Sequence, residues 1–186
     1  MKKTLIILGI IVLIIAGFIW TTYNKLITAN EAIDNQWAQV ETQYQRRFDL
    51  IPNLVESVKG IMSQEEKIFG DLAEARTNYS SANNSNQKAE AATQIEGTLS
   101  RLLVIMENYP ELKSAENVQT LMAQLEGSEN RVSVERKRYN DAVKNFNVLI
   151  KRFPSNLIAN QLGYSSKTYF EAETGSENAP KVDLTK

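Results

Sequence analysis

The stretch QYQRRFDLIPNLVESVKG, residues 43–60, decides how the chain folds beyond its N-terminus. Its apolar side chains recur at intervals of three and four, the period of an α-helix with one buried face. Two adjacent arginines, an aspartate and a proline lie beside that face. Because Pro52 lacks a backbone donor and crowds the carbonyl of Phe48, two interpretations remain open: one long helix bent near residues 48–52, or two helices that meet there.

The same apolar stripe extends in both directions from this stretch. It begins at Leu26 and Ile33, and it continues in phase through Val58 and Met62 as far as Tyr79. The polar sequence SSANNSN, residues 80–86, has no apolar period and predicts a turn between helices.

Two further helices are predicted after this turn. The segment 87–107 carries an inner apolar face and ends before Pro110. The segment 114–152 carries an apolar side chain every seven residues, which predicts a sustained bundle seam. Ser128 and Glu135 interrupt this seam, so we expect polar contacts near the centre of the bundle. The seam positions are Val118, Leu125, Val132, Tyr139 and Phe146.

Short connections between long amphipathic helices favour antiparallel packing. We therefore predict an all-α fold, an elongated antiparallel bundle of about four long helices over residues 24–163. Residues 164–186 lack helical periodicity and are predicted to be extended or disordered. Tyr164, Tyr169 and Phe170 are the side chains expected to pin the start of this tail to the bundle.

The N-terminus predicts a membrane anchor. Residues 5–23 are uncharged and would form a helix of about 28 Å, close to the thickness of a bilayer core. A cleaved signal peptide is the rival interpretation, but small residues do not occupy the positions that cleavage requires. The expected membrane is the bacterial cytoplasmic membrane. The positive-inside rule places residues 1–4 in the cytoplasm and the bundle on the other side of this membrane. The anchor residues are represented by Leu5, Ile10, Ile15, Trp20 and Tyr23.

Composition excludes several classes of function. The 186 residues contain no His and no Cys, so imidazole catalysis, thiolate chemistry and zinc–sulfur sites are ruled out. Beyond residue 23 the chain has 19 basic against 22 acidic residues, which argues against nucleic-acid binding. We predict no catalytic residues, no metal site and no cofactor, and a protein that is not an enzyme.

Three places are candidate interaction surfaces. The first lies around the proline of the opening stretch, where the alternative is ordinary salt bridging within the scaffold. The second is the loop at Pro110, since loops carry function more often than cores. The third is the start of the tail, where the alternative is a strap along the bundle. The candidate residues are Arg46, Arg47, Asp49, Pro52, Lys59, Glu107, Tyr109, Pro110, Tyr169 and Phe170.

An alternating-sign run occupies the middle of the segment 114–152. It either forms a buried polar network in the bundle or a solvated helix face with ion pairs such as Glu135 with Arg138. The residues of this run are Glu126, Glu129, Arg131, Glu135, Arg136 and Arg138.

Five stretches of the sequence resemble the bacterial LemA family, in the expected order and over most of the chain after residue 25. They are LITANEAIDNQWAQVETQYQRRFDLIPNLVESVKG (26–60), LSRLLVIMENYPELKSAENV (99–118), LEGSENRVSVERKRYNDAVKNFN (125–147), FPSNLIANQLGY (153–164) and KTYFEAETGSENAPKV (167–182).

This resemblance implies a helical-bundle domain on an N-terminal membrane anchor, with no established catalysis. The hypothesis that follows is a membrane-anchored, non-enzymatic interaction or scaffold protein of the cell envelope. The partners it suggests are the lipid bilayer, TPM-domain proteins, membrane proteases and a second copy of the chain. Two alternatives stay open: a ligand-binding or sensory helical domain, and an adaptor for a membrane protease or TPM-domain protein.

Overall fold

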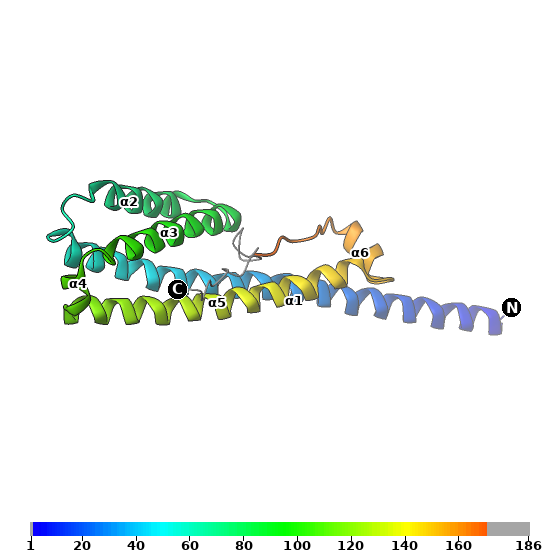
Figure 1. Ribbon diagram of the computed structural model, residues 1–186. Helices are drawn as coiled ribbons and strands as arrows, with labels where there is room; N and C mark the ends of the chain where they lie inside the picture. The colour runs from blue at the N-terminus through cyan, green and yellow to red at the C-terminus, as the bar shows by residue number, and fades with distance from the viewer. Residues whose placement is uncertain (1, 171–186) are drawn as a thin grey trace, which may run out of the picture.

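The computed structural model describes residues 2–170, and this part of the chain is built from helices without strands (Figure 1). The all-α bundle predicted from the sequence is confirmed. The helices are α1 (Lys2–Lys59), α2 (Glu66–Ser81), α3 (Ser85–Met106), α4 (Pro110–Ser114), α5 (Glu116–Lys151) and α6 (Ser155–Gln161).

Helices α1 and α5 run antiparallel and form the long axis of the molecule (Figure 1). The 58 residues of α1 span about 87 Å. The seven-residue seam predicted for α5 is confirmed, since all five of its positions are buried. They pack with an equally regular stripe on α1, which runs from Leu26 through Val40 and Tyr44 to Val58. Burial of this continuous seam stabilises both helices.

Helices α2 and α3 form a hairpin beside one half of the α1–α5 pair (Figure 1). Their turn is capped reciprocally. The Asn84 side chain accepts from the Gln87 backbone N–H at 2.9 Å, and the Gln87 side chain accepts from the Asn83 N–H at 3.0 Å. Such mutual capping satisfies two helix donors that would otherwise lack partners.

Of the two interpretations at Pro52, the structure supports one continuous helix across the proline and corrects the place where the helix ends. Pro52 lies inside continuous α1, and the chain turns instead at residues 60–65. Buried Phe48, Ile51 and Leu54 flank the proline, and their packing compensates for one lost backbone bond. The apolar stripe stayed in phase across the turn because Met62 within it is also fully buried. We call this end of the bundle, with residues 60–65 and 107–115, the distal end.

At the other end, α1 continues alone beyond the bundle (Figure 1). Its first twenty residues are exposed and rich in aliphatic side chains, and α1 is long and apolar enough to cross a membrane. Leu5, Ile10, Ile15, Trp20 and Tyr23 all lie on this exposed part.

Helix α6 packs against α1 and α5 at the base of the bundle (Figure 1). Gly163 follows it with a φ of +73°, a conformation that glycine adopts without strain. The chain then runs back along α5 as an extended strap, residues 164–170. The predicted tail covers residues 164–186, and its part from residue 171 onward lies outside the described part of the chain.

Candidate functional site: a charged layer beside an apolar groove

A charged layer joins three helices at the middle of the bundle. Glu96 on α3 lies between Arg47 of α1 and Arg136 of α5. One carboxylate oxygen is 3.3 Å from Nη1 of Arg47, and the other is 2.8 Å from Nη2 of Arg136. Arg47 is 6% exposed and Glu96 is 8% exposed, so this carboxylate is shared by two guanidinium groups away from bulk water.

Tyr44 extends the charged layer toward the apolar core. Its hydroxyl oxygen accepts a hydrogen bond of 2.7 Å from Nε of Arg136, whose guanidinium carbon lies 5.4 Å from the Tyr44 ring centroid. Burial, reinforced by the nearby Glu96 charge, raises the pKa of Tyr44 to about 12. Burial disfavours the charge on Arg136, but Tyr44 and Glu96 outweigh it and raise the pKa of that guanidinium. The phenol therefore stays neutral and the arginine stays charged at physiological pH.

Two polar pairs border this layer. Glu129 accepts from Nη2 of Arg47 at 3.4 Å, with most of its own side chain exposed. Glu135 accepts from Gln36 at 2.6 Å and from Arg138 at 2.7 Å. With two arginines facing Glu96 and Glu129, the charges of the layer balance. Removing one member of such a buried group is costly because a charge is left uncompensated.

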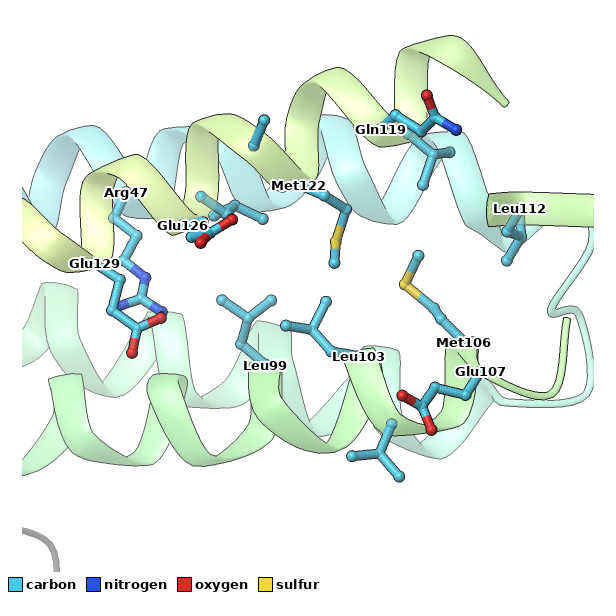
Figure 2. A pocket seen from close by; sticks show the side chains of 14 residues that line it. Arg47, Leu99, Leu103, Met106, Glu107, Leu112, Gln119, Met122, Glu126 and Glu129 are labelled. Carbon is cyan, nitrogen blue, oxygen red and sulfur yellow. The ribbon is translucent and has the colours of Figure 1, made fainter. Parts of the chain in front are cut away.

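Next to the charged layer, toward the distal end, an apolar groove of about 620 Å³ opens between α3 and α5 (Figure 2). Figure 2 shows Met122 reaching down from α5 while Leu99, Leu103 and Met106 reach up from α3. Leu112 of α4 lies at the distal end of the groove, and Arg47 lies at the end nearest the charged layer.

The chemistry of the groove is apolar inside and acidic at the rim. Three exposed glutamates border it, Glu107 on the α3 side and Glu126 and Glu129 on α5. Methionine side chains are flexible and polarisable, so they adapt to apolar surfaces of different shape. The volume lies within the range of sites that bind small molecules, and its open shape also suits a helix that presents an apolar face.

Asparagines on α5 hold the strap. Asn147 donates to the Lys167 carbonyl at 2.9 Å and accepts from the Lys167 N–H at 2.8 Å. Asn140, one heptad earlier, pairs in the same way with Phe170 at 3.0 and 2.9 Å. Each amide thus replaces the backbone partner that an extended segment would find in a sheet.

Phe170 places the strap against the charged layer. Its ring stacks on Trp37 at 5.6 Å, and the Arg136 guanidinium carbon lies 5.4 Å from its centroid. Tyr164 packs edge-on against Phe146, whereas Tyr169 is exposed. Two of the three aromatics expected to pin the tail therefore contact the bundle.

The candidate residues around Pro52 do not form one patch. Arg47 points into the charged layer, while its neighbour Arg46 is exposed on another face of α1. Asp49 is exposed and lies 4.0 Å from Arg76 of α2. Pro52 and Lys59 are exposed on the outside of the helix.

The second candidate surface lies at the distal end. Glu107 ends α3 and borders the groove. Tyr109 is half-buried, with its hydroxyl 3.5 Å from a carboxylate oxygen of Glu65, and Pro110 begins α4. Of the candidate residues, Arg47 and Glu107 line the groove.

Sequence reasoning missed Glu96, Asn140 and Asn147 as site residues, and it did not decide whether Arg136 was buried or solvated. A signal for Glu96 was present, because it stands on the inner face of α3 between Ala92 and Leu99 at helical spacing. The asparagines carried the heptad spacing of seven residues, but their partners are backbone atoms, which no side-chain pattern identifies.

Comparison with known proteins identifies the family. The sequence model of the LemA family matches residues 36–184. The chain is 25% identical to magnetosome protein MamQ 2 of Paramagnetospirillum magneticum, over 89% of this chain and 72% of that protein. It is 24% identical to magnetosome protein MamQ of Magnetospirillum gryphiswaldense, over 92% and 74%. It is 21% identical to protein LemA of Metamycoplasma hominis, over 80% and 68%. The chain therefore belongs to the LemA family.

Proposed function

We propose that this protein is a membrane-tethered interaction protein that binds a helix of a partner protein in the groove between α3 and α5. The observation that carries the proposal is the groove itself. It gathers nine apolar side chains in one concave surface of about 620 Å³, among which Val104 and Ala123 are exposed and Leu103 and Met122 are half-buried. An amphipathic helix fills such a groove with side chains spaced three and four residues apart.

The rim defines the chemistry of the partner helix. Glu107, Glu126 and Glu129 are exposed around the apolar lining, so the partner carries Lys or Arg beside its apolar face. Such rim charges act mainly on association rate and on the choice of partner. TPM-domain proteins, membrane proteases and a second copy of this chain are the candidate sources of that helix.

The tether is the N-terminal part of α1. We propose that residues 5–23 span the bacterial cytoplasmic membrane, with residues 1–4 in the cytoplasm and the bundle outside. The exposed aliphatic surface of this part and the two lysines before it support this placement. The role is a non-enzymatic one of adaptor or scaffold, in keeping with a chain that lacks His and Cys.

Site-specific photocrosslinking in native membranes tests this function. A benzophenone amino acid replaces Met122 in the groove, and in a matched variant it replaces Val134, an exposed apolar residue of the same helix outside the groove. We expect Met122 alone to crosslink to a partner, through a segment that mass spectrometry identifies as an amphipathic basic helix. Equal crosslinking from both positions, or none from Met122, would reject the groove as the docking site.

A second candidate function is binding of an acidic amphiphile in the same groove. Arg47 favours it, because Nε of this buried guanidinium meets no acceptor within residues 2–170 and lies beside the apolar lining. Native mass spectrometry of the purified protein with a long-chain fatty acid tests it. A one-to-one complex that is lost in Arg47→Met would support this function, and no complex would exclude it.

A further inference from the structure

Helix α6 sits where the bundle meets the lone part of α1 (Figure 1). Thr22, 4% exposed, is the first buried residue along α1 and marks the point at which the bundle begins. Trp20 and Tyr23, the exposed aromatics at the end of the apolar stretch, flank this point. Aromatic residues at such a position lie at the headgroup level of a bilayer. The segment from Phe153 through α6 therefore lies at the headgroup level as well.

Three large apolar side chains of this segment are exposed. Phe153 is 76% exposed and Leu157, four residues later, is 61% exposed. Leu162 at the end of α6 is also exposed, while Ala159 is buried against the bundle. Phe153, Leu157 and Leu162 are thus large apolar side chains that the bundle does not cover. An exposed apolar patch of this kind marks an interaction surface.

The charges within this segment have one sign. Residues 151–170 contain no Asp or Glu, although acidic residues make up 22 of the 186 in the chain. Lys151 and Arg152 lie exposed directly before Phe153. Basic residues beside protruding apolar side chains are the combination that binds the interface of an anionic bilayer.

We propose that the segment from Lys151 to Leu162 is a second membrane contact. Phe153 and Leu157 insert into the boundary between headgroups and acyl chains, while Lys151 and Arg152 bind anionic lipid phosphates. The inference rests on the proposed membrane anchoring of residues 5–23, and it holds for either orientation of the chain. Two contacts with the bilayer fix the bundle relative to the membrane plane, whereas a single helix would let it swivel.

The absence of native cysteine permits a direct test in the full-length protein. Single variants Phe153→Cys and Leu157→Cys are labelled with an environment-sensitive fluorophore and reconstituted into phosphatidylethanolamine–phosphatidylglycerol vesicles, with and without brominated acyl chains as quenchers. Ile61→Cys is the matched control, since Ile61 is an apolar residue 42% exposed at the distal end. Ile10→Cys within the span reports insertion of the anchor.

We expect quenching at Phe153 and Leu157 to exceed that at Ile61 by at least about twofold, and to fall when phosphatidylcholine replaces both lipids. Quenching at Ile10 with none above the Ile61 level at Phe153 and Leu157 would overturn the second contact and leave the anchor intact. Absence of quenching at Ile10 would overturn the anchor, and the second contact with it. Equal quenching in phosphatidylcholine would overturn the role of Lys151 and Arg152.

Discussion

Two levels of the bundle differ in what lies between α3 and α5. At the middle, Glu96 joins Arg47 and Arg136, so charge holds the three helices together. Toward the distal end the apolar groove lies between the same helices, where Leu103 faces Met122 (Figure 2). The α2–α3 hairpin is therefore held beside the groove by a specific polar contact, so an apolar surface can stay open without the hairpin detaching.

Of the substitutions considered, Glu96→Gln should lower the free energy of unfolding most. This substitution keeps the volume of the side chain but leaves two arginines facing each other without their shared carboxylate. We expect a loss of about 3 kcal/mol in the free energy of unfolding, measured by urea denaturation in detergent. The control Glu126→Gln removes an exposed groove carboxylate and should cost less than about 0.5 kcal/mol. Similar losses of unfolding free energy in both variants would mean that the charged layer does not stabilise the fold.

The pH dependence of the free energy of unfolding also tests the charged layer. The pKa of Tyr44 is raised to about 12 by burial and by Glu96, against 10.0 for an exposed phenol. The folded state thus favours the neutral phenol. The contribution of neutral Tyr44 to the free energy of unfolding is fully present below about pH 10 and is lost as pH rises to about 12.

We therefore expect wild type to lose about 2 kcal/mol more than Tyr44→Phe between these two pH values, by urea denaturation at each. The comparison isolates Tyr44, since lysines that titrate in the same range are common to both proteins. Parallel losses in the two proteins would show that Tyr44 ionises as freely in the folded state as in the unfolded chain.

Asn147→Ala tests the strap that closes over the other side of the charged layer. It removes both hydrogen bonds to Lys167, so we expect the Lys167 amide to exchange about tenfold faster by hydrogen–deuterium exchange. Asn145→Ala, an exposed asparagine on the same helix, should leave this rate unchanged. An unchanged rate in Asn147→Ala would show that the Asn140 hydrogen bonds and the aromatic contacts hold the strap without Asn147.

The smallest effect on stability is expected at the groove. Met122 is half-buried and meets open space, so Met122→Gln should change the free energy of unfolding by less than about 1 kcal/mol in urea denaturation. The same variant should lose the crosslinked partner when the benzophenone stands at neighbouring Ala123. A loss of 3 kcal/mol or more would place Met122 in the core rather than in a docking surface.

Regular apolar spacing made much of the fold predictable. The seam on α5 and the turn between α2 and α3 follow from periodicity and from small polar residues, and both are found where expected. The turn at residues 60–65 escaped prediction because buried Met62 kept the apolar stripe in phase while the chain changed direction.

The candidate site was less accessible to sequence reasoning. Arg47 was singled out, but Glu96 lies 49 positions away in the chain and Arg136 a further 40. Only packing decides that these charges face one another. The groove is equally hidden from the sequence, since the apolar residues that line it have the same spacing as residues in a closed core.

The most direct test of this account is the distance across the groove in the presence and absence of the charged layer. Spin labels at Val104→Cys on α3 and Ala123→Cys on α5, both exposed positions that line the groove, report this distance by pulsed electron resonance. We predict one narrow distribution in the otherwise unchanged protein, and a broader and longer one when Glu96→Gln is added. A distribution that Glu96→Gln leaves unchanged would contradict the claim that the charged layer holds the hairpin beside the groove.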